Sequence, residues 1–354
     1  MDRREFLKKS SLAALALVGL PPLLVRGEEG TEPTSQDSSR SRVVVAHSSQ
    51  VTDANGTIDR SRLHSLLREA ALAFTGRSDP RDAWASLLHP FCSSDTIGIR
   101  VNCISAKCPS HPQLVEAIVE SLHQVGIPPE QIVIWDRTGW EMEKAGYRLN
   151  QGGKGVQCYG LDAEGVGFDQ QSTAEIPSAN LILPLGRILT RICDHIINVP
   201  VIKDHSLSGF TFSLKSAYAY LPLSKAIPRV VNRVRAMHAH DCDPQIAELN
   251  LCPIIRSKSR LIIGDALTGV FDGGPIAPAN WRPNRLLLGT DPVATDSVAL
   301  DLLEEKRREE GFPSLRAKAR YIKTAARFGL GTIDRERIER LDLDLETGDE
   351  KGDG

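Results

Sequence analysis

Aromatic side chains and net charge are both scarce in this sequence of 354 residues. It has four Trp, five Tyr and nine Phe, and its formal net charge is -2 at pH 7. Proteins that bind nucleic acid usually show a basic face, or aromatic residues interleaved with basic ones, and neither pattern is present. The composition, 41% hydrophobic and 25% charged, is typical of globular proteins. We therefore expect a folded protein with no nucleic-acid partner.

Closely spaced cysteines are also lacking. The chain has seven cysteines but no CxxC, and the closest pair is Cys103 and Cys108. Iron–sulfur clusters and classical zinc sites need thiolates at short spacing, so no intrinsic iron–sulfur cluster is expected. Seven is an odd and low number, which does not favour a disulfide scaffold. P-loop, GxSxG and strand-following GxGxxG motifs are absent too, which removes three common catalytic signatures.

The apolar run Leu12–Val25 is too short, and with Pro21 and Pro22 too broken, for a comfortable membrane span. A charged start precedes it and a polar stretch follows it, which is the pattern of an export signal. The paired Arg3 and Arg4 resemble the twin-arginine (Tat) signal, which sends already folded proteins across the inner membrane. The Tat export machinery is therefore an expected partner, and a periplasmic or otherwise exported location is expected.

Four regions are predicted along the chain. Residues 1–27 form the signal, and no clean small-x-small cleavage site follows them, so retention by an uncleaved N-terminal anchor is the alternative. Residues 28–42 are polar and predict a flexible linker. Residues 43–340 form a single domain, since no internal repeat or linker interrupts them. Residues 341–354 are acidic and predict a frayed tail.

Short β-branched runs alternate with helical patterns throughout the body. This alternation predicts an α/β fold, with a mainly parallel sheet covered by helices on both faces. Six glycines between 152 and 167 mark a loop-rich insertion. Strands are expected at 43–46, 96–101, 131–135, 156–159, 179–183, 195–202, 260–263 and 285–288. Helices are expected at 58–74, 111–125, 138–145, 209–221, 223–237, 290–308 and 314–328.

Polar clusters directly follow four of these predicted strands. Open parallel sheets bind ligands at the carboxyl ends of their strands, so the coincidence favours one shared crevice. The clusters are Asn102 with Lys107; Asp136 with Arg137 and Thr138; Lys203 with His205; and Asp265, followed by Asp272, Gly273 and Gly274. Residues two apart in an extended chain project to the same side, so Lys203 and His205 share a face. His205 is then a candidate to transfer a proton beside an anion held by Lys203.

Each cluster also has a purely structural interpretation. Asp136 with Arg137 suits an ion pair beside a helix cap, and Gly273 with Gly274 suits a turn. Asp291, followed by proline, has the pattern of an N-cap, although it is also a candidate ligand-binding residue. The densest set of potential metal ligands is His238, Cys242 and Asp243, which makes a divalent metal one candidate cofactor, but the spacing matches no standard zinc pattern.

Several of these segments together resemble the family called domain of unknown function 362. The resemblance covers about residues 43–335 and its twin-arginine start is similar to the exported branch of that family. It rests on an ordered set of motifs: GIRVNC at 98–103, HPQLVEAI at 111–118, IWDRT at 134–138, VPVIKDH at 199–205, TFSLK at 211–215, CDPQIAELN at 242–250, GGP at 273–275 and TDPVATD at 290–296. Many relatives add a ferredoxin-like module, which this chain lacks, and Ser216 stands where the family usually has Asn. The resemblance also brings Lys215 into the candidate site, but implies no settled activity.

Two functions follow from these observations. In the first, Lys107, Arg137, Lys203 and Lys215 line a crevice that binds a small anionic ligand or acts on it as an enzyme, and Asp265 or Asp272 binds a metal or takes a proton. In the second, the protein is a redox accessory that docks with an iron–sulfur redox partner or carries a metal through His238, Cys242 and Asp243. The reaction stays open at this level.

Overall fold

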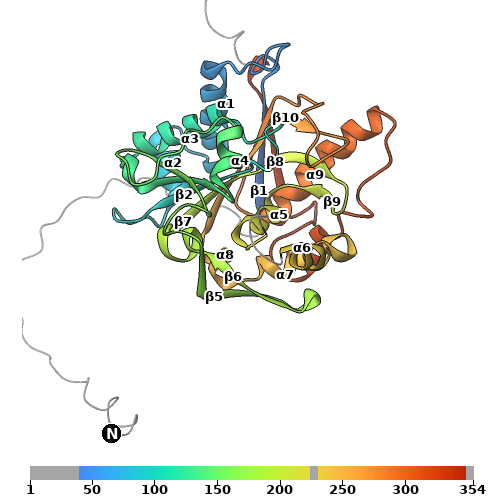
Figure 1. Ribbon diagram of the computed structural model, residues 1–354. Helices are drawn as coiled ribbons and strands as arrows, with labels where there is room; N and C mark the ends of the chain where they lie inside the picture. The colour runs from blue at the N-terminus through green and yellow to red at the C-terminus, as the bar shows by residue number, and fades with distance from the viewer. Residues whose placement is uncertain (1–39, 224–229, 348–354) are drawn as a thin grey trace, which may run out of the picture. The chain divides into compact units, whose positions relative to one another are not determined.

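A ten-stranded sheet runs through the computed structural model, which describes residues 40–223 and 230–347 (Figure 1). The main path has the order β12-β1-β11-β10-β7-β2-β3-β4, and β8 pairs with both β10 and β9. The strands of the sheet are β1 (Ser41–His47), β2 (Ile97–Val101), β3 (Ile132–Asp136), β4 (Gln157–Gly160), β7 (His195–Val199), β8 (Val201–His205), β9 (Gly209–Thr211), β10 (Ser259–Val270), β11 (Arg285–Gly289) and β12 (Ile338–Asp344).

The sheet is mainly parallel, as the alternating pattern predicts. Neighbours from β10 through β7, β2 and β3 to β4 are all parallel, and β8 runs parallel to β10. The antiparallel strand β11 lies between β10 and β1. Because successive parallel strands end at the same edge, the loops after β2 and β3 lie together at one side of the molecule.

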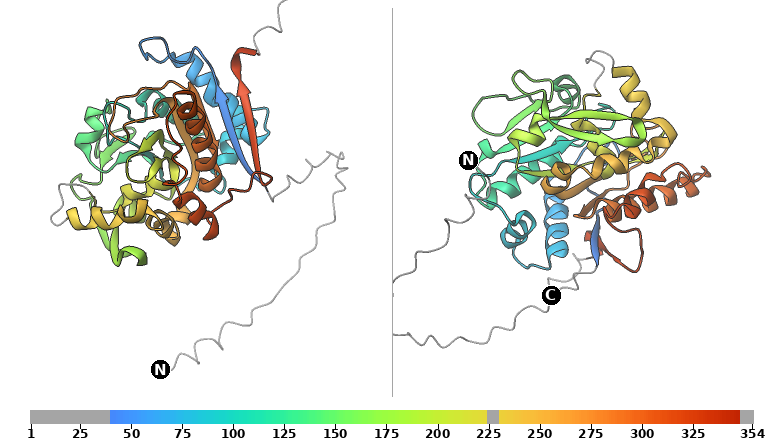
Figure 2. Two further views of the ribbon diagram at one scale, coloured as in Figure 1. Left: turned by 90° about the vertical axis from the view of Figure 1, so that its right-hand side faces the viewer. Right: turned by 90° about the horizontal axis from the view of Figure 1, so that it is seen from below.

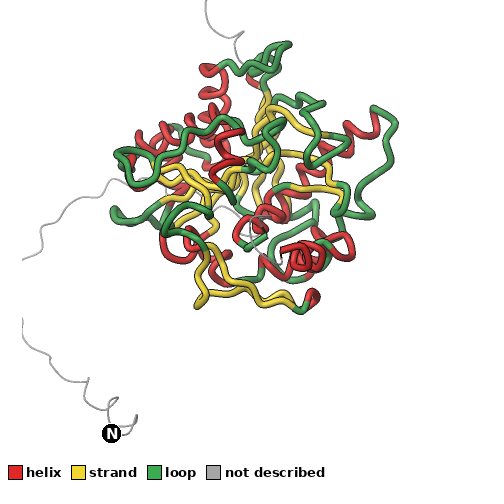
Figure 3. Tube along the Cα trace, viewed as in Figure 1, coloured by secondary structure: helices red, strands yellow, loops and turns green. Residues whose placement is uncertain are grey.

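Helices cover both faces of the sheet (Figure 3). Val43 and Val45 of β1 pack into one hydrophobic core, whereas Val44 and Ala46 pack into the other, as the two-residue period of a strand requires. Helices α1 (Arg60–Thr75), α2 (Pro80–Leu88), α3 (Pro112–Gln124) and α4 (Gly139–Lys144) contribute to the second core. Helices α5 (Ser213–Ser216), α6 (Val230–Met237), α7 (Gln245–Asn250), α8 (Pro253–Lys258), α9 (Pro292–Glu309) and α10 (Tyr321–Arg327) contribute to the first.

The strand expected at 195–202 is two strands. Pro200, which has no N–H to donate, separates β7 from β8, and its carbonyl accepts a hydrogen bond from Asp265 N at 2.8 Å. The long strand β10 pairs first with β7 and then with β8. Lys203 and His205 therefore lie within β8, and Asp265 lies within β10, instead of following their strands.

Other expected boundaries also need correction. The region 209–221, expected to be a helix, contains the short strand β9 and only one α-helical turn, α5. Residues 314–328 form a shorter helix, α10. The glycine-rich insertion leads into a separate antiparallel pair, β5 (Phe168–Ile176) and β6 (Leu181–Gly186). The expected signal segment, most of the expected linker and residues 348–354 lie outside the described residues.

Residues 341–344, expected to belong to a frayed acidic tail, are part of strand β12. Strand β12 pairs in parallel with β1 along its whole length, and the two lie side by side in Figure 2. Arg42 Nε of β1 lies 2.9 Å from a carboxylate oxygen of Glu339, which adds an ion pair to the ladder. Strand β1 itself starts at Ser41, within the region expected to be a linker. Alternating charged and apolar residues suit this edge strand, because one of its faces meets solvent.

Candidate functional site

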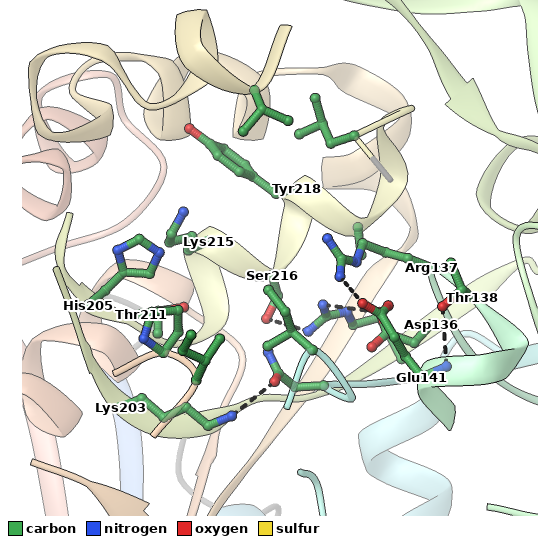
Figure 4. Close-up of a pocket in the computed structure, with 18 of the residues that line it drawn as sticks. Asp136, Arg137, Thr138, Glu141, Lys203, His205, Thr211, Lys215, Ser216 and Tyr218 are labelled. Atoms are coloured by element: carbon green, nitrogen blue, oxygen red, sulfur yellow. Dashed lines mark hydrogen bonds and ion pairs between the residues drawn. The ribbon is translucent and has the colours of Figure 1, made fainter. Parts of the chain in front are cut away.

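A cavity of about 740 Å³ lies at the carboxyl ends of β2 and β3. Strand β8, helix α5 and the turn that follows α5 close its other sides, and Figure 4 shows the labelled side chains directed into it. Its lining includes eight of the residues that the sequence predicts for ligand binding, catalysis or metal binding. The predicted residues that line it are Asn102, Asp136, Arg137, Thr138, Lys203, His205, Lys215 and His238.

Lys203 and His205 project from β8 into the cavity, and the intervening Asp204 points the other way. The carboxylate of Asp204 accepts a hydrogen bond from Gly274 N at 2.6 Å. The alternation expected for an extended chain is thereby confirmed. The turn at Gly273 and Gly274 is fixed to β8 by this bond, and a Cβ on Gly274 would meet the Asp204 carbonyl oxygen at 2.2 Å. These glycines position a loop, and neither lines the cavity.

Lys203 is completely buried at one end of the cavity. Its ammonium donates to the amide oxygen of Asn102 at 3.2 Å. Burial lowers its pKa, because the charged form loses its hydration. Asn102 is a neutral partner, so it orients the ammonium without neutralising it.

Lys215 projects into the cavity from helix α5, whereas Lys203 projects into it from strand β8. Its Nζ lies 3.3 Å from His238 Nε2, 3.9 Å from Cys242 Sγ and 4.2 Å from the centre of the Tyr218 ring. Burial lowers the pKa of Lys215 to about 8. His238 Nδ1 lies 2.8 Å from the Val234 carbonyl oxygen, so Nδ1 carries the proton and Nε2 accepts from the lysine. Lys215 is thus surrounded by uncharged groups.

His205 is a neutral donor in this site. Its Nδ1 accepts from Leu207 N at 3.1 Å and from Ser208 N at 3.2 Å, which leaves the ring proton on Nε2. Burial, together with Lys215 and His238, lowers the pKa of His205 to about 2. A histidine held in this state donates a hydrogen bond at neutral pH and is a poor proton acceptor.

Arg100 and Asp136 form a buried ion pair behind these groups. Arg100 Nη2 lies 3.5 Å from Asp136 Oδ1, and Arg100 Nη1 donates to Ser216 Oγ at 2.9 Å. Asp136 Oδ2 accepts from Cys103 N at 2.6 Å. The Nε of Arg100 is buried without a hydrogen-bond partner in the described chain. Arg100, which lines the cavity, therefore has one buried donor without a partner in the described chain.

Arg137 and Thr138 are held by the first turn of α4. The guanidinium of Arg137 pairs with the carboxylate of Glu141. Thr138 caps α4, because its hydroxyl accepts from Glu141 N at 3.3 Å. Both residues therefore have the structural role considered from the sequence, and both also line the cavity.

Other predicted site residues lie away from the cavity. Asp265 is fully buried and accepts from His111 N at 2.7 Å and His111 Nδ1 at 2.8 Å. Asp272 lies 3.5 Å from Arg307 Nη1 on the outside of the molecule. Neither aspartate lines the cavity, so the expected convergence of both on one cleft with Lys203 and His205 is wrong, although Asp265 is near enough to attract the Lys203 ammonium.

Lys107 and Asp291, which were also expected at the site, do not line the cavity. Lys107 is exposed, and its carbonyl oxygen accepts from Ala279 N at 3.2 Å. Asp291 is the N-cap of α9, where one carboxylate oxygen accepts from Val293 N at 2.8 Å and Ala294 N at 2.9 Å. The capping interpretation of Asp291 is confirmed.

His238, Cys242 and Asp243 do not form a cluster. The Lys215 ammonium stands beside His238 and Cys242, and Asp243 faces Arg320, whose Nε is 3.9 Å away. Among residues 40–223 and 230–347, no group of three or more His, Cys, Asp or Glu side chains is placed to hold a metal ion. The Lys215 ammonium lies beside His238 and Cys242, where its positive charge would repel a metal cation.

Sequence reasoning missed several cavity residues. Arg100 carries a charge in the middle of a strand buried on both faces, and that conflict with the apolar pattern is the signal that could have found it. Ser216 follows the predicted Lys215 directly. Thr211 and Pro275 lie within the quoted motifs TFSLK and GGP. The remaining ones, with no sequence signal of their own, are Ile104, Trp140, Glu141, Asp162, Tyr218, Ala219, Leu223, Val234 and Ile276.

Fold and site together define an α/β protein with a lysine-lined cavity at the strand ends of a mainly parallel sheet. The chain belongs to the family described as domain of unknown function (DUF362), whose model matches residues 97–301. That match includes every predicted residue that lines the cavity. The predicted family membership is confirmed, and the family description assigns no activity.

Two further comparisons assign no function to this chain. A crystal structure of a protein from Thermotoga maritima, a structural-genomics target, is similar at 12% identity with a TM-score of 0.34. The similarity covers 70% of this chain and 58% of that protein's chain. No curated protein matches this sequence.

Within the described residues, no helix is long and apolar enough to cross a membrane.

Proposed function

We propose that this protein binds a small anionic molecule in the cavity, between Lys203 and Lys215. One observation carries the proposal: both lysines are buried, and among the described residues neither forms an ion pair with a carboxylate. Asp136 and Asp265 attract the Lys203 ammonium only from beyond ion-pair distance. A buried charge without an opposite charge in contact is costly, so two such lysines in one cavity favour a ligand that compensates them. A bound anion would supply the missing charge.

The other cavity cations support this assignment by contrast. Arg100 has Asp136 and Arg137 has Glu141, so each guanidinium already has a carboxylate. The two lysines are therefore the cavity cations that have no carboxylate in ion-pair contact among the described residues. His205 adds a neutral Nε2–H donor beside Lys215, which suits an anion's oxygen.

What the cavity offers chemically is stabilisation of negative charge. Two ammonium groups and one imidazole N–H are held in place by the fold at this cavity, where preorganised donors stabilise negative charge more strongly than in bulk water. His205 is poorly suited to the proton-accepting role considered from the sequence. We propose binding, with charge stabilisation as the chemical capability that an enzymatic activity would use.

We further propose that the protein acts outside the cytoplasm, after export by the twin-arginine route. The support is the sequence pattern of residues 1–27 alone. The metal-carrying alternative has no comparable support, because Lys215 stands beside two of its three expected ligands.

Replacing each lysine by methionine tests the proposal. We expect Lys203→Met and Lys215→Met each to weaken sulfate binding by about tenfold or more, because each removes a charge-assisted hydrogen bond. The melting temperature should stay the same or rise, since an unpaired buried charge is replaced by an apolar chain of similar length. Calorimetric titration with sulfate and thermal unfolding measure the two quantities.

Lys258→Met is the matched control. Lys258 is half-buried, lies outside the cavity and donates to the Cys193 carbonyl oxygen at 2.6 Å. This variant should lose stability and keep its sulfate affinity. If the two cavity variants unfold at lower temperature and bind sulfate like the parent, the lysines are structural and the proposal fails.

A further inference from the structure

Three exposed apolar side chains surround the mouth of the cavity. Ile104 is 39% exposed, Trp140 is 63% exposed and Ile276 is 66% exposed, and all three line the cavity. They come from three separate segments: the loop after β2, the start of α4 and the loop after β10. Large apolar side chains with this exposure lose free energy to water unless something covers them.

Hydrogen bonds tie two of these loops together. Ser105 Oγ donates to the Ile276 carbonyl oxygen at 3.2 Å, and Ala279 N donates to the Lys107 carbonyl oxygen at 3.2 Å. The Asp204–Gly274 hydrogen bond fixes the second loop to β8. Ile104 and Ile276 are therefore held at the mouth by the fold.

The cavity is also much larger than a bare anion needs. Pockets of about 300–1,000 Å³ are typical for organic ligands and cofactors, and this one measures about 740 Å³. Lys203 and Lys215 are buried in it, whereas the apolar lining residues Ile104, Trp140 and Ile276 are exposed. The lining thus combines buried ammonium groups with exposed apolar side chains, and Asp162 is the exposed carboxylate among the lining residues.

We infer that the ligand is an amphiphilic organic anion: its anionic group meets Lys203 and Lys215, and an apolar group of about the size of a ring covers Ile104, Trp140 and Ile276. This inference rests on the proposed anion binding and adds the class of the ligand. Three side chains around an opening are too small a surface for a stable protein partner, which needs about 800 Å² on each side. They suit one apolar group of a bound molecule.

Two phosphonates with one head group and different substituents test the inference. The full-length protein should bind phenylphosphonate at least about tenfold more tightly than methylphosphonate, because only the phenyl group covers the apolar mouth. Benzoate and acetate form the corresponding carboxylate pair and show which head group the lysines prefer. Calorimetric titration gives the four dissociation constants.

Substitutions at the mouth assign the preference to the named residues. Ile276→Ser and Trp140→Ala should each reduce the preference for phenyl over methyl to about threefold or less, and leave methylphosphonate affinity within about twofold. Ile182→Ser is the matched control, since Ile182 is also 66% exposed but lies on β6, outside the cavity. It should keep the full preference.

The outcomes separate the two proposals. Equal affinity for both phosphonates overturns the amphiphilic ligand and leaves anion binding in place. A phenyl preference that survives in both mouth variants also overturns it, because the apolar group then binds elsewhere. If neither phosphonate nor either carboxylate binds the parent protein, anion binding itself fails and this inference fails with it.

Discussion

Individual contacts determine which cationic side chains in this cavity lack a carboxylate partner. The two arginines face carboxylates, whereas Lys215 faces an imidazole nitrogen, a thiol and an aromatic ring. None of these three groups is negatively charged when the thiol is protonated, and burial raises the pKa of Cys242. With no negative group to offset it, the cost of burial lowers the pKa of Lys215 to about 8. Its charge is then sensitive to mildly alkaline pH.

Sulfate affinity should therefore fall as pH rises through about 8. Below this value Lys215 is charged and attracts the anion; above it the lysine loses its proton, and affinity drops by up to about tenfold for each pH unit. Burial lowers the pKa of Lys203 too, which acts in the same direction. His205 and His238, with pKa values lowered to about 2 and about 4, stay neutral above pH 5. Titrations between pH 5 and 10 measure the profile.

Lys215→Arg provides the control for this profile. A guanidinium keeps its charge throughout the range, so the variant should lose most of the fall above pH 8, even where its affinity at pH 7 differs from the parent's. A profile of the same shape in parent and variant would assign the pH dependence to another group.

At the scale of elements, helix α5 brings Lys215 and Ser216 into the site although it has only four residues. A single turn is not stable by itself, since helix nucleation is costly. Asp296 of α9 holds it: its carboxylate accepts from Ser213 N at 2.8 Å, from Leu214 N at 3.2 Å and from the Ser213 hydroxyl. Asp296 is fully buried and does not line the cavity, so it acts as a positioning residue.

Replacing Asp296 by alanine should therefore affect both stability and binding. We expect a loss of about 1–3 kcal/mol in the free energy of unfolding, because buried donors on α5 lose their acceptor. Sulfate affinity should fall by about fivefold or more, because Lys215 is no longer held against the cavity. Denaturant unfolding and calorimetric titration of the same preparation measure both changes.

Asp291→Ala separates positioning from simple destabilisation. Asp291 caps the same helix α9, and its loss should cost about 1 kcal/mol or more. It does not contact α5 in any described hydrogen bond, so sulfate affinity should remain that of the parent. If both variants lost affinity in proportion to stability, Asp296 would have no specific role in placing Lys215.

At the scale of the whole molecule, a single compact unit follows the expected signal. Residues 40–223 and 230–347 belong to one unit, and its seven cysteines are all free. Six of them are buried, and burial raises the pKa of several, including Cys103 and Cys193. A body without disulfides can complete its folding in a reducing compartment, which is compatible with transport of the folded protein.

Replacing Arg3 and Arg4 together by lysine tests the proposed route. The double variant should accumulate as folded protein in the cytoplasm, because lysine keeps the charge but not the paired guanidinium groups. Cell fractionation followed by thermal unfolding of the cytoplasmic material measures location and foldedness together. Export of the variant at the parent's level would rule out the twin-arginine route.

The sequence alone was sufficient to predict the α/β architecture and part of the site. Strands such as 131–135 and 285–288 are short apolar runs between turn signals. Such runs indicate the strands of a sheet that is buried on both faces. Asn102 and Asp136 to Thr138, at the carboxyl ends of β2 and β3, line the cavity as predicted. Parallel strands necessarily bring their carboxyl ends to one edge, so order along the chain predicts neighbourhood in space.

Only the tertiary structure decided which charges meet. Asp265 follows four apolar residues and looked like the end of a strand, but backbone pairing with β8 continues β10 to Val270, and the carboxylate turns to His111. Arg100 and Trp140 line the cavity because its other walls come from segments distant in the sequence, among them β8 and α5. Local patterns report the period of a strand or a helix, whereas the partner of a side chain depends on which segments pack together, and that is settled only by the three-dimensional fold.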